Sequence, residues 1–279
     1  MKIHRIETGK VRVKENQLKK SGGMTPKMLK VLFGQDWSEW LPIYAWVIEH
    51  AEGVIVIDTG ETHKTNNTGY LPRWHPYYSL AVKFDVKQDD EIGLQLLKMG
   101  IDPVKDVKKV IMTHMHTDHA GGLYHFPNSE IIIDKNEYKA ASGVTGILAG
   151  YLPHRWPKWL NPTLITLPNV PYFSFRQSMA VTADKKVMIV GTPGHVAGHI
   201  SVIAEMEDVQ YFIAGDTSYT EENLLKLIPD GIGTDQSRAT LQNILSFTES
   251  KPTIYLPSHD PQVPDRMENL KIVPMYKND

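Results

Sequence analysis

The most chemically informative residues of this chain lie between Thr113 and Gly122, where the sequence reads T-H-M-H-T-D-H-A-G-G. Three histidines and one aspartate stand close together there, within the segment from His114 to His119. Neutral imidazole and carboxylate groups are ligands that suit zinc and similar divalent metals. The apolar run 110–112 predicts a buried strand, and a tight loop leaving that strand can turn these side chains around one small volume. The motif therefore predicts a metal site rather than a solvated polar loop.

Further candidate ligands follow three later apolar runs. His195 comes after the run 187–190, Asp216 after the run 211–214, and His259 after the run 253–256. Loops at strand ends commonly carry functional residues. Each of these residues alone is typical of a turn or a structural position. Only together with the histidine motif do they indicate a complete metal site.

The whole pattern resembles the metallo-β-lactamase fold superfamily. H-x-H-x-D-H is followed by G-H, then an aspartate, then a histidine, and the resemblance extends from Leu41 to His259. It implies an α/β fold, a four-layer αβ/βα sandwich with the site at one edge. It also implies that Asp58, in the sequence I-D-T-G, supports the ligands from behind. The implied ligands are His114, His116 and His195 for one metal, Asp118, His119 and His259 for the other, and Asp216 between the two.

The expected cofactor is a pair of Zn²⁺ ions per chain, and other divalent metals are compatible with the same ligands. Because the chain has no cysteine, it has neither a thiolate ligand nor a disulfide. Two adjacent divalent ions can share a water and lower its pKa toward about 7, which supplies hydroxide at neutral pH. The expected chemistry is attack of this metal-bound hydroxide on a carbonyl group.

The substrate has to be inferred from other residues, because this fold hosts many activities. Tyr219 stands three positions after Asp216, as in N-acyl-homoserine lactonases, the quorum-quenching group that this chain resembles. The resemblance implies opening of the lactone ring, with the Tyr219 hydroxyl donating a hydrogen bond to the carbonyl oxygen. Asp118 then carries a proton to the leaving alkoxide. His199 is expected to support the site without binding metal.

Two other classes of function remain open. One is a thioesterase of the glyoxalase II kind, or a hydrolase of another lactone. Against the thioesterase, Arg266 and Lys271 are isolated and make no convincing glutathione site near the C-terminus. The other is a metal-binding scaffold without turnover, which the complete set of ligands disfavours.

The elements that position these residues are short strands and helices in alternation. Runs rich in β-branched residues predict buried strands at 53–58, 109–113, 130–134, 187–190, 211–214 and 253–256. The mixed run 41–49 predicts a strand at a sheet edge or beside a cleft. One helix is expected from Asp89 or Asp90 to Met99, with Ile92, Leu96 and Met99 on its apolar face and Gly100 after it. Another is expected over 237–250 behind an Asp235 cap. This alternation predicts α/β layers with sheet packed on sheet and helices outside.

Two aromatic-rich segments, near 19–40 and 136–161, predict partly helical insertions in a single domain that spans residues 1–279. For both segments, packing in a local core or contact with a second copy in a homodimer is favoured over lining a substrate site. The apolar residues Met24, Phe33 and Trp37, together with the segment 74–84, are nevertheless expected to line an acyl pocket.

Composition excludes several classes of partner. The net charge is -2 and no block of lysines or arginines stands out, so nucleic acid is a poor partner. No run approaches the length of a membrane span, and the first residues lead into no apolar signal segment. The sequence is therefore expected to be soluble and cytoplasmic, with a small-molecule lactone as its partner.

Overall fold

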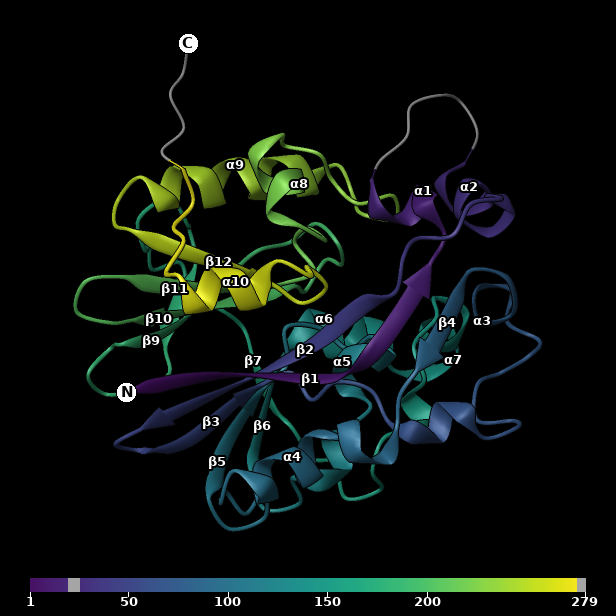
Figure 1. Cartoon of the computed structure of the whole chain (residues 1–279), viewed down its shortest axis with the longest axis horizontal. Helices are drawn as coiled ribbons and strands as arrows, with labels where there is room; N and C mark the ends of the chain where they lie inside the picture. Colours follow the sequence, from purple (N-terminus) through teal and green to yellow (C-terminus); the bar gives the residue numbers. More distant parts are fainter. Residues whose placement is uncertain (20–25, 275–279) are drawn as a thin grey trace.

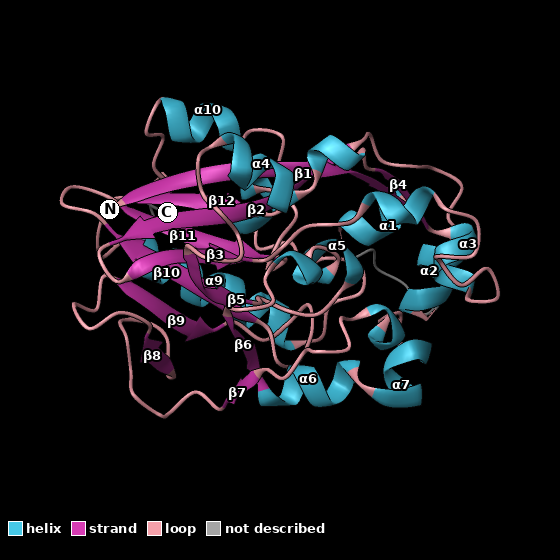
Figure 2. Ribbon diagram, turned by 90° about the horizontal axis from the view of Figure 1, so that it is seen from below, coloured by secondary structure: helices cyan, strands magenta, loops and turns pink. Residues whose placement is uncertain are grey.

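A computed structural model describes residues 1–19 and 26–274 of the chain. In this part of the chain, two mixed β-sheets pack against each other, and helices cover their outer faces (Figures 1 and 2). The first sheet has the order β4-β1-β2-β3-β5-β6-β7 and the second the order β12-β11-β10-β9-β8. The strands of the first sheet are β1 (Lys2–Val13), β2 (Leu41–His50), β3 (Gly53–Ile57), β4 (Val82–Asp85), β5 (Val107–Ile111), β6 (Glu130–Asp134) and β7 (Thr163–Ile165). Those of the second are β8 (Ser178–Ala180), β9 (Val187–Gly191), β10 (Ile200–Glu205), β11 (Gln210–Gly215) and β12 (Thr253–Pro257).

The helices are mostly short, and several of them gather near one end of the sheets. Figure 2 shows α1, α2 and α3 at that end. The α-helices are α1 (Glu15–Leu18), α2 (Lys27–Phe33), α3 (Pro76–Leu80), α4 (Ile92–Lys98), α5 (Thr117–Ala120), α6 (Lys135–Ala141), α7 (Gly143–Leu148), α8 (Glu221–Leu225), α9 (Gln236–Thr248) and α10 (Val263–Glu268). In the described part of the chain, no helix is both long enough and apolar enough to cross a lipid bilayer.

The side chains of β2 contribute to two different hydrophobic cores. Successive side chains of a strand point to opposite faces. Trp46 and Ile48 join the core between the two sheets, whereas Ala45 and Val47 join the core under α4 and α5. A third core lies between the second sheet and the helices α8 and α9. The expected αβ/βα sandwich is therefore confirmed.

Of the two places predicted for the run 41–49, a sheet edge or beside a cleft, the edge is wrong for β2. The strand is buried in the interior of its sheet, because β1 pairs with it on one side and β3 on the other. No strand was predicted over residues 2–13, since polar and apolar residues mix there. Without β1, the run 41–49 has no partner on that side.

The two predicted helices are present with different starts. α4 begins at Ile92 behind Glu91, and Asp90 instead accepts a hydrogen bond from the backbone N–H of Lys87. Ile92 and Leu96 are buried as expected, but Met99 lies beyond the helix and is 39% exposed. The expected stop at Gly100 fits its left-handed backbone, with a φ of 81°. Asp235 precedes α9 without a side-chain capping bond.

Candidate metal centre

The strands bring the predicted ligands to one edge of the sandwich. β3 and β5 are parallel, and so are β11 and β12. The carboxyl ends of each parallel pair therefore lie side by side. The loops after β3 and β5 carry Asp58 and the histidine motif, and the ends of β11 and β12 carry Asp216 and His259. His195 follows β9 in the same sheet, so residues far apart in sequence converge.

The structure brings the candidate ligand atoms of each of the two predicted sets close together. His114 Nε2 and His195 Nε2 each lie 3.0 Å from His116 Nδ1. In the other group, His259 Nε2 lies 3.5 Å from Asp118 Oδ2. His119 belongs to this second group. Donors of a tetrahedral ion with bonds near 2.0 Å are about 3.3 Å apart, so both groups have the spacing of a coordination shell.

Asp216 lies between the groups and turns one carboxylate oxygen toward each. Its Oδ1 is 3.4 Å from His119 Nε2 and 3.4 Å from His259 Nε2. Its Oδ2 is 3.6 Å from His195 Nε2 and 4.0 Å from His114 Nε2. A carboxylate placed in this way can bridge two cations.

A second observation supports the fit of these donors to divalent metals. His119 Nε2 and Asp216 Oδ1 are buried and have no hydrogen-bond partner among the described residues. Buried polar atoms are ordinarily paired, and an ion at this position satisfies both. Burial and then neighbouring imidazoles, His119 beside His114 and His195 beside His116, hold the pKa values of His114 and His116 well below their usual range. Both rings are therefore neutral, as a metal ligand must be.

Partners behind the ligands fix which nitrogen faces the site. The Nδ1–H of His119 donates to Asp58 at 2.8 Å, that of His195 to Asp230 at 2.9 Å, and that of His259 to the Pro42 carbonyl at 2.8 Å. Each bond leaves the Nε2 lone pair for the site. Asp58 is also held by the backbone and hydroxyl of Thr113, each at 2.7 Å. Asp58 therefore lies where the sequence predicts a supporting carboxylate.

His199 supports the bridging aspartate, as expected. Its Nε2 accepts the backbone N–H of Asp216 at 3.1 Å, and its Nδ1 lies 2.9 Å from the Thr192 hydroxyl. Burial and then the neighbouring His195 lower the pKa of His199 to about 3, so the ring is neutral and can accept. Burial would raise the pKa of Asp216, but His259 and His119 beside it hold that pKa well below its usual range.

The two glycines of the motif lie close to the loop after β3. A Cβ at Gly122 would lie 2.3 Å from the Thr59 carbonyl, and one at Gly121 would lie 2.3 Å from Glu61. The glycines therefore let α5 pack against the loop after β3, which holds the motif in place from behind.

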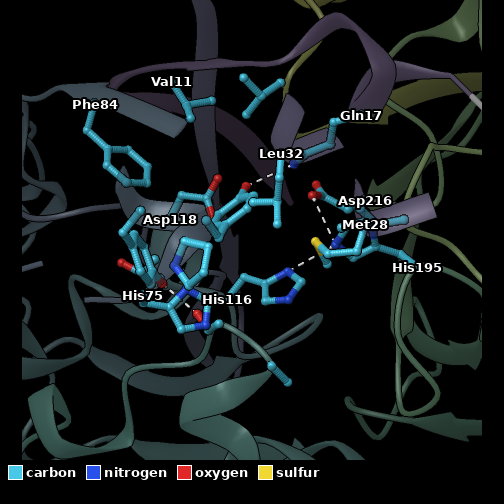
Figure 3. A pocket seen from close by; sticks show the side chains of 18 of the residues that line it. Val11, Gln17, Met28, Leu32, His75, Phe84, His116, Asp118, His195 and Asp216 are labelled. Atoms are coloured by element: carbon cyan, nitrogen blue, oxygen red, sulfur yellow. Dashed lines mark hydrogen bonds and ion pairs between the residues drawn. The ribbon is translucent and has the colours of Figure 1, made fainter. Parts of the chain in front are cut away.

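A cavity ends on the ligand cluster, and the empty space in it is about 890 Å³ when the part open to solvent is included. Figure 3 shows Phe84 and His75 on one side of it and Met28, Gln17 and Asp216 on the other, with His116 below and between them. The wall is mainly apolar. Its apolar residues include Val11 and Val13 of β1, Met28 and Leu32 of α2, Phe84 of β4 and Leu148 of α7. Residues of both helical segments therefore line this cavity, and the expected contact with a second copy stays a prediction.

The residues expected to form this wall are partly corrected. Met24 lies outside the described residues. Phe33 is 71% exposed, Trp74 is 64% exposed, and neither lines the cavity. Trp37 instead packs under the Lys14 ammonium, which is 4.0 Å from the ring centre. Met28 and Leu32 both line the cavity because residues four apart share a helix face, and Met28 remains 48% exposed.

Tyr219 lies beside the candidate ligand His259. The ring is buried, lines the cavity and lies 5.6 Å from the His259 ring. Its hydroxyl accepts a hydrogen bond from Gln17 Nε2 at 2.8 Å. Burial and then the charge of Asp216 raise the pKa of Tyr219 well above its usual value, so the hydroxyl keeps its proton.

Sequence reasoning missed three residues of the site. Asp230, which holds His195, lies 35 positions from it, and no local pattern links the two. Gln17 and Tyr77 also line the cavity, from α1 and α3. Tyr77 falls in the aromatic segment that the sequence singled out, but nothing distinguished it from its neighbours. Gln17 had no signal, because a lone glutamine is usually exposed.

An αβ/βα sandwich that gathers imidazoles and carboxylates into a dinuclear metal site defines a class of metalloproteins. The chain belongs to the metallo-beta-lactamase superfamily, whose sequence profile matches residues 38–259. It is similar to an N-acyl homoserine lactonase from Bacillus sp, with 27% identity over 239 residues that cover 85% of this chain and 87% of the relative. It is 24% identical to the N-acyl homoserine lactonase AttM from Rhizobium radiobacter, over 99% of this chain and 98% of the relative.

Solved structures show the same fold. An N-acyl homoserine lactone hydrolase with N-hexanoyl-L-homoserine bound at its catalytic metal centre superposes with a TM-score of 0.72, at 23% identity over 99% of this chain and 98% of that one. AidC, a dizinc quorum-quenching lactonase, superposes with a TM-score of 0.61, at 16% identity over 93% of this chain and 87% of that one.

Proposed function

We propose that this protein is a dinuclear metal hydrolase that opens the lactone ring of N-acyl-homoserine lactones. The observation that carries the proposal is the apolar cavity that ends on the ligand cluster beside Tyr219. Such a cavity suits a substrate with an apolar chain at one end and a hydrolysable ester at the other. The lactonase names of the relatives support the same substrate class.

The residues would hold two divalent ions, and zinc is our proposal because every ligand is an imidazole or a carboxylate. The ligands are His114, His116 and His195 on one side, Asp118, His119 and His259 on the other, and Asp216 between them. When bound, the ions polarise the ester carbonyl and activate a water. Geometry and ligand type support these assignments equally for both sides.

The protein groups divide the remaining tasks. Tyr219 donates its hydroxyl proton toward the carbonyl oxygen, where negative charge develops during attack. Asp118 lines the cavity, and its carboxylate can carry a proton to the leaving oxygen. Asp58 keeps His119 in the tautomer that presents Nε2. The apolar wall excludes water from the acyl end.

The thioesterase alternative finds no support in the cavity. Arg266 is buried and pairs with Asp260 at 2.6 Å, and Lys271 pairs with Asp265. Neither residue lines the cavity, so neither is placed to bind the carboxylates of glutathione. We also propose a single domain, because one core cluster joins residues of both sheets. A cytoplasmic location and a homodimer stay predictions.

The test is turnover of N-hexanoyl- and N-decanoyl-homoserine lactone beside S-lactoylglutathione, with protein loaded with zinc. We expect ring opening, followed by acid release, and no comparable thioester hydrolysis. His116→Ala should abolish turnover, whereas His50→Ala, which changes a histidine outside the cavity, should leave it unchanged. Hydrolysis of the thioester alone would replace the lactonase proposal, and no turnover of any substrate would favour a metal-binding scaffold.

A further inference from the structure

Gln17 is a buried polar residue in the cavity that the proposed chemistry does not use. It lies in α1, its side chain is 3% exposed, and it lines the cavity next to Tyr219. The Gln17 carbonyl accepts the backbone N–H of Gly231 at 2.8 Å. A Cβ at Gly231 would lie 1.8 Å from the Asn16 carbonyl, so the glycine is required for this close approach. α1 is therefore fixed against the loop that carries Asp230.

The side-chain amide of Gln17 joins two tyrosines from different elements. Gln17 Nε2 donates to the Tyr219 hydroxyl at 2.8 Å and to the Tyr77 hydroxyl at 3.0 Å. An amide nitrogen has two protons and accepts nothing, so both hydroxyls must act as acceptors toward it. Each hydroxyl then keeps its own proton for another partner. Among the described residues, Gln17 is the one hydrogen-bond partner of either hydroxyl.

The number of buried donors and acceptors left unpaired also sets the orientation of the Gln17 amide. Gln17 Oε1 is buried and has no partner among the described residues. Turning the amide over would leave two buried N–H donors unpaired in place of one acceptor, which is the less favourable arrangement. Both tyrosines line the cavity that contains Asp118 and Asp216, so the two free protons belong to groups on the substrate side.

We propose that Gln17 is a positioning residue that presents the Tyr219 and Tyr77 hydroxyls as a pair of hydrogen-bond donors to the substrate. This inference rests on the proposed function, because an N-acyl-homoserine lactone has two carbonyl oxygens. Tyr219 serves the ring carbonyl, where charge develops. Tyr77 serves the amide carbonyl, which stays neutral throughout. The pair therefore selects lactones that carry an acylated amine over simple alkyl lactones.

The first test is a double-mutant cycle between Gln17→Met and Tyr219→Phe on N-hexanoyl-homoserine lactone. Methionine keeps the length of the side chain and removes the donor. We expect kcat to fall about fivefold in the single variant, the loss of one hydrogen bond. In the Tyr219→Phe background the same change should have no further effect on kcat, because Gln17 acts through that hydroxyl. An independent fivefold loss in that background would overturn the inference.

The second test separates the two tyrosines. Tyr77→Phe should raise KM for the homoserine lactone about fivefold and leave kcat unchanged, since a neutral carbonyl is bound equally in the ground and transition states. It should leave γ-decalactone, which has no amide, unaffected. An equal effect on both substrates would show that Tyr77 only packs. Gln177→Met, which changes a glutamine outside the cavity, is the matched control and should alter neither constant.

A readout that needs no turnover tests the alignment itself. The Gln17 side-chain NH₂ resonances in a nitrogen-15 NMR spectrum, assigned by their loss in Gln17→Met, should shift in both Tyr219→Phe and Tyr77→Phe. Unshifted resonances in both would refute the donation. If the wild type hydrolyses only a thioester, the proposed function fails. The kcat cycle then runs on that thioester, whose carbonyl also becomes an oxyanion, and still decides the role of Gln17.

Discussion

Asp230→Asn should reverse the tautomer of His195 while leaving the shape of the site unchanged. Asp230 Oδ1 accepts the backbone N–H groups of Ile232, at 2.9 Å, and of Gly233. Its Oδ2 accepts the Nδ1–H of His195 at 2.9 Å. An asparagine must keep its oxygen toward the two backbone donors, so its NH₂ group faces the imidazole. His195 then accepts at Nδ1 and carries its proton on Nε2, the atom that should bind metal.

The magnitude follows from the cost of restoring the ligand tautomer. Binding a metal requires the proton to return to Nδ1, where it opposes a buried N–H of the asparagine. An unsatisfied buried donor costs about 1–3 kcal/mol, or roughly a 5- to 150-fold loss of affinity. In other metalloproteins, changing a group that hydrogen-bonds to a metal ligand lowers metal affinity or activity about 10- to 100-fold, which is the same range. Only the ion at the His114–His116–His195 group should be affected.

The assay is competition with a chelating dye, followed by metal analysis of the protein. At a dye concentration where the wild type keeps two ions per chain, Asp230→Asn should keep about one. Nitrogen-15 chemical shifts of the imidazole should report the reversed tautomer in the metal-free protein. Asp102→Asn is the matched control, because Asp102 also accepts two backbone N–H groups but faces no histidine. Two ions held with wild-type affinity by Asp230→Asn would refute the argument.

The remaining predictions concern other parts of the same site. The purified protein should hold about two divalent ions, and His116→Ala should lose metal and activity together; full activity at near-zero metal content would rule out the dinuclear site. Tyr219→Phe should lower kcat about tenfold, less than the hundredfold or more seen for a sole oxyanion donor, with metal content unchanged; a wild-type kcat would make it a packing residue. kcat/KM should rise with acyl length by at most about 0.8 kcal/mol per methylene, and Leu32→Ala should flatten this rise whereas Phe33→Ala should not; equal slopes in both would mean that the chain binds elsewhere. Burial raises the pKa of the Glu61 carboxyl to about 8. The protonated carboxyl therefore contributes to the free energy of unfolding at pH values below its unfolded-state pKa near 4.5, and this contribution is lost as pH rises from there toward 8. Glu61→Gln should therefore gain thermal stability relative to the wild type across that interval, and a constant difference in melting temperature would contradict this reasoning.

Where sequence and structure agree, the information is local. The histidine motif needs only a strand and a tight loop to converge, and the three other ligands each follow a β-branched run that forms a buried strand. α4 was located by its apolar spacing, but its start was not, because Glu91 at the start turns its carboxylate to Thr62 and His63 instead of capping the helix.

The faces of the helical segments were less predictable. Periodicity identifies residues that share a face, but it does not say what that face meets. α2 could have turned either Leu32 or Phe33 toward the cavity, and its packing beside α1 and α3 decided for Leu32. The path of β1 placed β2 in the interior of its sheet.

By itself the sequence indicated the candidate ligands, the αβ/βα layers and the tyrosine beside Asp216. These depend on residue type, on short spacings and on the ends of apolar strands. Only the tertiary structure decided which groups hold those ligands and that tyrosine in place. Asp230 meets His195 across 35 positions, and Gln17 meets Tyr219 across 202. Such hydrogen bonds follow from the path of the whole chain, because a polar side chain pairs with whatever buried partner packing brings within reach.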